Sequence, residues 1–98
     1  MAQYDVYRGK PGLGYLLDCQ SELLDHLPTR VVIPLIPAEL VSDMKRLNPI
    51  LTVQGEPMTV ATHLIFTIGT KELDKPVASL SDDHYTIKNA LDMLISGY

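Results

Sequence analysis

Apolar and polar residues alternate in several short stretches along the first two thirds of the chain, which is the pattern of half-buried β-strands. Glycine and proline punctuate these stretches, so each strand should be short. The pattern predicts strands over residues 3–7, 15–19, 30–36, 50–53, 57–61 and 64–68, with a short hairpin connection at 54–56. Pro34 and Pro37 cannot donate to a ladder, and we therefore expect them at a sheet edge or at a bulge.

The last part of the chain follows the helix period instead. Ser81 is expected to cap this helix, and the two aspartates after it place negative charge where the helix dipole favours it. At about 100° per residue, the residues that should form one apolar stripe facing the sheet are Ile87, Ala90, Leu91, Leu94 and Ile95. Tyr85 and Met93 lie off this stripe, and we expect Met93 to be exposed near the chain end.

Composition indicates one small globular domain. The 98 residues are enough for a modest core, and 46% hydrophobic content with 20% charge is ordinary for a globular protein. Short strands followed by one helix make the chain mainly β with a C-terminal helix, as a small antiparallel barrel or sandwich over residues 1–98. The net charge is −4 and the basic residues are dispersed, which argues against nucleic-acid binding. Without a signal peptide or a segment of membrane-spanning length, a cytoplasmic protein without membrane contact is expected.

The first part of the chain carries only weak hints of chemistry. Gly9, Gly12 and Gly14 resemble a phosphate loop loosely, because the residues after them are predicted to form a strand and not a helix. The three histidines lack the close spacing of metal ligands, and Cys19 has no second cysteine with which to bind a metal or form a disulfide. No metal site and no cofactor are therefore expected.

Two groups of residues have the right types for acid–base chemistry. Residues 81–84 read Ser-Asp-Asp-His, but adjacent positions on a helix do not face one another. Asp18, Glu22 and Asp25 are carboxylates that could serve as general acids or bases, although acidic residues at strand ends and turns are usually solvated. Neither group is a strong catalytic signal, so we expect no catalytic residues.

The chain stops directly after the apolar part of the helix, with only Ser96, Gly97 and Tyr98 following. Chain ends usually fray unless something ties them down, so this end is expected to contact a partner. Asp92 and the terminal carboxylate lie where the helix dipole prefers cations, and a cationic partner would relieve that cost. The alternatives are that Tyr98 packs on its own core and that Gly97 is an ordinary helix cap.

Four stretches, in their order and spacing, resemble the CcdB family of bacterial toxins. They are QYDVY at 3–7, LDCQSELLD at 17–25, RVVIPL at 30–35 and IKNALDMLISG at 87–97. The third is the most specific, because it is similar to the family's Arg-x-Val-Ile-Pro-Leu strand. The resemblance spans the full length, with a poor match over 54–79.

The resemblance implies an SH3-like antiparallel barrel with a small side sheet and a C-terminal helix, assembled as a two-fold homodimer. It further implies a toxin of a toxin–antitoxin module that is not an enzyme and needs no cofactor. Such a toxin binds the A subunit of DNA gyrase and traps the complex with cleaved DNA. A cognate antitoxin, whose C-terminal segment is disordered until it binds, neutralises the toxin.

Carried over residue by residue, the resemblance implies a gyrase-binding surface presented by both protomers. Its residues are Leu23, Leu24, Asp92, Ile95, Ser96, Gly97 and Tyr98. One of the two leucines is expected in the core, and Ile95 and Ser96 stand where the family pattern has Phe and Trp, so Tyr98 is the candidate for the aromatic contact. Arg8 and Lys10 are candidates for pairing with acidic residues of the antitoxin. The alternatives are a MazF-type endoribonuclease, which shares the barrel fold, and a relative that has lost gyrase poisoning.

Overall fold

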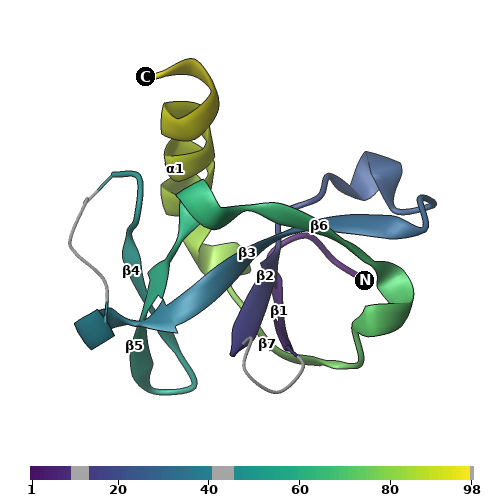
Figure 1. Ribbon diagram of the computed structural model, residues 1–98, viewed down its shortest axis with the longest axis horizontal. Coiled ribbons are helices and arrows are strands. Elements are labelled where there is room, and N and C mark those ends of the chain that lie inside the picture. Colours follow the sequence, from purple (N-terminus) through teal and green to yellow (C-terminus); the bar gives the residue numbers. More distant parts are fainter. Residues whose placement is uncertain (10–13, 41–45, 98) are drawn as a thin grey trace.

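The computed structural model describes residues 1–9, 14–40 and 46–97, and within these ranges one antiparallel sheet of seven strands curls into a half-barrel (Figure 1). The strand order is β4-β5-β3-β2-β1-β7, and β6 pairs with β3 beside this path. The strands are β1 (Asp5–Arg8), β2 (Tyr15–Asp18), β3 (Thr29–Pro37), β4 (Ile50–Val53), β5 (Glu56–Val60), β6 (Phe66–Gly69) and β7 (Pro76–Ser79). The helical segments are the short 3-10 helices η1 (Glu22–Leu24), η2 (Ala38–Leu40), η3 (Thr62–Leu64), η4 (Thr70–Glu72) and η5 (Ser81–Asp83), and the α-helix α1 (His84–Ser96). The mainly β class with a C-terminal helix is confirmed.

Two predicted strands begin later than the pattern indicated. Strand β1 starts at Asp5 because Tyr4 has a positive φ of 70°, a conformation that no strand continues. Strand β6 starts at Phe66 because residues 62–64 form η3, which turns the chain from β5 back to β3. The alternation of apolar and polar residues alone does not reveal either of these local turns.

Strand β3 is the centre of the sheet and not an edge, which corrects one interpretation of Pro34. Along one side β3 pairs with β2. Along the other side it pairs first with β6, up to Val32, and then with β5, from Leu35 onward. The carbonyl of Pro34 accepts from the Ala61 N–H at 3.0 Å on the side where the partner strand changes. The nitrogen of Pro34 faces that same side, so its missing N–H falls in the gap between two ladders. Pro37 is the last residue of β3.

The β4–β5 hairpin closes the open side of the half-barrel through one side chain. Its turn consists of two residues, Gln54 and Gly55, both at positive φ (50° and 84°), which is shorter than the predicted connection. The Gln54 Nε2 donates to the Val77 carbonyl of β7 at 3.1 Å, and the Tyr15 hydroxyl donates to its Oε1 at 3.4 Å. Strands at opposite ends of the sheet order are thereby connected.

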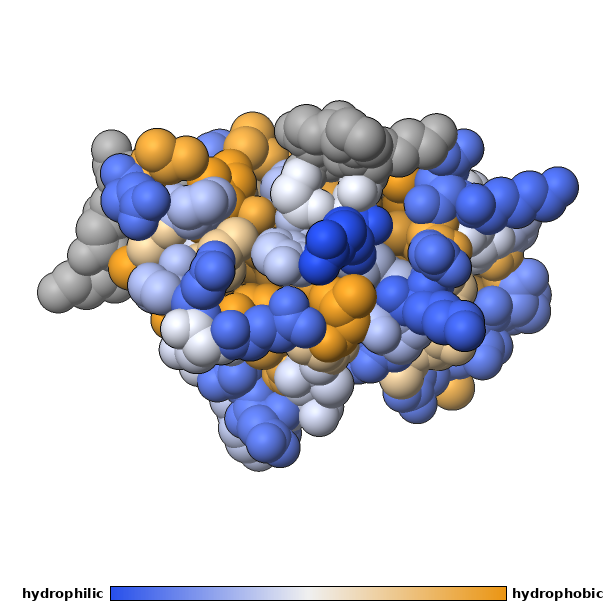
Figure 2. Space-filling view, turned by 90° about the horizontal axis from the view of Figure 1, so that it is seen from below, coloured by the Kyte–Doolittle hydropathy of each residue, from blue (hydrophilic) through white to orange (hydrophobic). Residues whose placement is uncertain are grey.

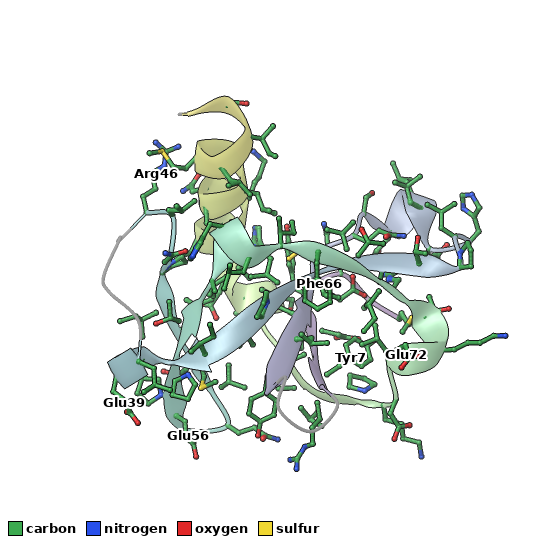
Figure 3. The ribbon with its side chains drawn as sticks, viewed as in Figure 1. Tyr7, Glu39, Arg46, Glu56, Phe66 and Glu72 are labelled. Atoms are coloured by element: carbon green, nitrogen blue, oxygen red, sulfur yellow. The ribbon has the colours of Figure 1, made fainter. Side chains whose placement is uncertain are left out.

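The sheet buries apolar residues on both faces. Val6, Leu17 and Ile33 lie opposite one another on β1, β2 and β3 and pack beneath α1 with Ile87. The other face carries a second cluster of Tyr7, Leu16, Val32 and Leu73, with Phe66 and Ile68 packed against it. Figure 3 shows Tyr7 and Phe66 in the part of the molecule that β6 and η4 enclose. Strand β6, which belongs to the same seven-stranded sheet, and the residues around η4 thus cover the second cluster.

The helix begins three residues later than Ser81, which is therefore not its cap. Residues Ser81–Asp83 form η5, and Asp83 occupies the cap position without a side-chain hydrogen bond. Ile87 and Ala90 are fully buried as predicted, whereas Ile95 is 78% exposed and does not belong to the buried stripe. Figure 1 gives the reason, because the last turns of α1 rise away from the sheet and have no strand beneath them. Met93 and Tyr85, predicted to lie off the stripe, are both exposed.

Candidate partner-binding surface

The end of α1 is held by its buried face and presents the opposite face to solvent. Ile87 and Ala90 anchor the helix in the core, and Leu91 and Leu94 are half-buried. Asp92, Ile95, Ser96 and Gly97 form the end of this helix, and we call them the helix end. Ile95 and Ser96 are exposed, so an isoleucine lies on the surface where packing does not require one. Tyr98 lies outside the described residues.

Gly97 ends the helix in the left-handed conformation. Its φ is 77° and ψ is 16°, and its N–H donates to the Met93 carbonyl at 3.1 Å. A Cβ built at this position would meet nothing within 4 Å, so the space around it is open. Gly97 is therefore the C-cap of α1, and its left-handed backbone conformation favours glycine without any contact to a partner.

Asp92 already has a cation beside it, which the sequence pattern did not predict. The Lys88 Nζ lies 2.9 Å from Asp92 Oδ2, one helical turn away, with side-chain exposures of 63% and 44%. The hydrogen bond to Asp92 and the charge of that carboxylate raise the pKa of Lys88. The unfavourable position of an acid near the helix C-terminus is thus partly compensated within the protein.

The η1 turn presents two leucines outward, and we call Leu23 and Leu24 the leucine turn. They are 87% and 46% exposed, so neither is in the core, contrary to the expectation for one of them. The Leu23 N–H donates to the Ser21 hydroxyl at 3.2 Å, which caps the turn. The Gln20 side chain holds the turn against β3, because its Nε2 donates to the Leu24 carbonyl at 2.8 Å and its Oε1 accepts from the Val31 N–H at 3.1 Å.

A buried ion pair beneath the leucine turn supports Gln20. Arg30 Nε and Nη2 donate to Asp18 Oδ2 at 3.0 and 2.7 Å, and both side chains are fully buried. Asp18 Oδ1 accepts from the Gln20 N–H at 3.0 Å. Asp18 is therefore not a solvated carboxylate, and it is not grouped with Glu22 and Asp25, which are exposed on and beside η1. Sequence reasoning missed this network, although the alternation that places Asp18 and Arg30 on one sheet face was available as a signal.

The helix end and the leucine turn are two separate parts of the molecule. Figure 1 shows α1 and η1 rising from the same side of the sheet, with β6 and the N-terminal segment between them. The residues predicted for a single surface are thus brought to the same side but not into one continuous cluster within one protomer.

The two predicted antitoxin residues are placed only in part. Arg8 is exposed at the end of β1, and its guanidinium carbon lies 5.7 Å from the centre of the Tyr15 ring, a cation–π distance. Lys10 lies outside the described residues. Figure 2 shows the molecule from below the view of Figure 1. Hydrophilic residues cover most of that face, and apolar residues form separate patches between them.

The described part of the chain shows no arrangement typical of catalysis or metal binding. Burial, with a smaller effect of the Asp18 charge, raises the pKa of the Cys19 thiol to about 12, so this thiol is not an activated nucleophile. No three His, Cys, Asp or Glu side chains among these residues are placed to hold a metal ion. None of the helices in the same ranges is long and apolar enough to cross a membrane.

A comparison with protein families gives a match that covers nearly the whole chain. The model of the family described as CcdB protein matches residues 3–97. The matched range includes the buried ion pair, the leucine turn and the helix end. The chain therefore belongs to the CcdB family, and this membership supports a toxin of a toxin–antitoxin system.

Proposed function

We propose that this protein is a non-enzymatic cytoplasmic toxin that binds the A subunit of DNA gyrase, traps the cleaved-DNA complex and is neutralised by a cognate antitoxin. The observation that carries the proposal is the exposed, apolar and acidic helix end in a chain that the CcdB family matches over residues 3–97. The partner surface comprises Leu23, Leu24, Asp92, Ile95, Ser96, Gly97 and Tyr98.

The leucine turn and the helix end supply the apolar part of the contact. Leu23 and Ile95 gain little from folding because most of each side chain stays in water. Burial of one such side chain in an interface contributes about 1.5–3 kcal/mol. Asp92 adds a charge that selects a basic partner surface, and polar groups of this kind determine specificity more than affinity.

A two-fold homodimer accounts for the separation of the two parts in one protomer. Helix α1 packs against η3, and Met93 and Leu64 on these elements are both exposed apolar residues. A second copy that covers this side would bury them and would present two helix ends to the target. A symmetric target with a central axis fits such a paired surface.

Ser96 favours a second candidate function. A tryptophan can anchor an interface by burying a large area, whereas a serine cannot. A family member that keeps the fold and antitoxin binding but no longer poisons gyrase is therefore the second candidate. A MazF-type endoribonuclease is not favoured, because the family match, the net charge of −4 and the dispersed basic residues all oppose it.

Antitoxin binding is proposed for the surface around Arg8, the exposed last residue of β1. The exposed guanidinium can pair with an acidic side chain while the Tyr15 ring supports it. Lys10 is proposed as a second cation for the same segment. A disordered antitoxin tail that folds on binding can wrap around the surface of the toxin and reach both cations.

The test is gyrase-dependent DNA cleavage. Supercoiled plasmid, gyrase and the full chain should give linear DNA, and the same mixture without gyrase should not. A variant that lacks residues 96–98 should lose the cleavage while it still folds and dimerises. Binding of the antitoxin without any cleavage at high protein concentration would favour the second candidate, and degradation of single-stranded RNA without gyrase would establish the endoribonuclease.

A further inference from the structure

The helix end is an electronegative site, and Lys88 pairs with its acidic side chain. The last turn of α1 contains no basic residue in the described structure, and its terminal carbonyls carry the negative end of the helix dipole. Lys88 lies one turn earlier and reaches Asp92 at 2.9 Å. At about 100° per residue, Lys88, Asp92 and Ile95 fall within about 60° of one another on one helix face. An exposed apolar side chain therefore borders the ion pair.

We propose that Lys88 occupies, in the free protein, the cation site that Asp92 offers to a basic side chain of the target. The inference rests on the proposed function and adds a regulatory contact to its surface. Lys88 is then an internal competitor, and binding of the target exchanges one ion pair for another.

The exposed character of the pair makes this exchange physically reasonable. Pairs between solvent-exposed charges on a helix are weak, and the order with lysine before the acid is the less favourable one. When a partner covers Ile95, water leaves the site and the attraction between Asp92 and a second cation increases. The partner's cation therefore gains more from Asp92 than Lys88 does in the free protein.

The competitor role can be tested with matched charge removals in the full chain. Lys88→Met removes the internal cation, and Lys71→Met removes the same charge from η4, which lies away from α1 in Figure 1. The affinity for the A subunit of gyrase is measured by calorimetry, with thermal unfolding as a check of the fold. We expect Lys88→Met to bind about two- to five-fold tighter than wild type at low salt, and Lys71→Met to bind as wild type does.

Two further variants locate the effect. Asp92→Asn should weaken binding, and the double variant Lys88→Met with Asp92→Asn should bind no tighter than Asp92→Asn alone.

The proposal is overturned if Lys88→Met binds no tighter than Lys71→Met, or if its gain persists in the Asp92→Asn background. Wild-type protein that shows no binding to the A subunit of gyrase would instead refute the proposed function, and the inference with it.

Discussion

Replacing Asp18 by asparagine should remove a large part of the free energy of unfolding. The fully buried Arg30 guanidinium donates to Asp18 Oδ2 through Nε and Nη2, at 3.0 and 2.7 Å. Asparagine fills nearly the same volume and can still accept from the Gln20 N–H. With its oxygen toward the Gln20 N–H, its amide nitrogen faces the Arg30 donors, so the variant removes both the compensating negative charge and the acceptor of the guanidinium.

The expected loss follows from the burial of both groups. Breaking a buried ion pair from one side costs about 3–5 kcal/mol, because the other charge stays buried without compensation. The Arg30 Nη1 already has no hydrogen-bond partner in the described structure, so no second acceptor can take over. Against the roughly 5–15 kcal/mol of a typical domain, this loss brings the protein close to unfolding.

The assay is urea unfolding followed by circular dichroism, with linear extrapolation to water. All samples need one protein concentration, because association changes the apparent stability. Asp74→Asn is the matched control, since it removes the same charge from an exposed position and should change the free energy by less than about 0.5 kcal/mol. A loss below about 1 kcal/mol for Asp18→Asn, the value of an exposed pair, would refute the reasoning.

Three further outcomes follow from the same network and its neighbours. Tyr7→Phe should leave the unfolding midpoint unchanged or raise it, because the buried Tyr7 hydroxyl has no partner among the described residues; a clear drop would reveal a bound group that it contacts. Gln20→Ala should cost about 1–3 kcal/mol in urea unfolding and should weaken gyrase binding, because both hydrogen bonds of its side chain hold the leucine turn. Equal binding by this variant would show that the turn needs no such support. Burial raises the pKa of Cys19 from 9.0 to about 12, so its contribution to stability is complete below pH 9.0 and is lost as the pH rises toward 12. Urea midpoints of wild type and Cys19→Ala across this range should therefore converge, and parallel curves would contradict the assignment.

Much of the sheet could be predicted because its strands have one exposed and one buried face. Residues 50–53 and 57–61 alternate as two strands around a glycine, and the structure pairs them as a hairpin. The prediction failed where one residue leaves the strand conformation, as at Tyr4 with its positive φ. Tyr4 is neither glycine nor asparagine, so its residue type does not signal the conformation.

The residues of the candidate site could be predicted from the sequence, but the contacts that position them could not. The resemblance named the leucines at 23 and 24 and the residues of the helix end, and the structure shows most of them exposed. It did not indicate Gln20, which holds the leucine turn, or Lys88, which pairs with Asp92. Contacts between residues far apart in sequence, such as Gln20 with Val31, depend on strand register, which periodicity alone leaves open.

The sequence by itself determined the class of fold, the family and the residue types available at the surface, because periodicity and motif order are properties of the chain. The tertiary structure decided which of those residues are buried and which meet. It placed Asp18 with Arg30 inside the protein, left Ile95 exposed by carrying α1 beyond the sheet, and put Lys88 beside Asp92. The physical reason is that burial and charge pairing depend on packing between distant segments, so the same acidic residue type is buried with an arginine at position 18 and partly exposed beside a lysine at position 92.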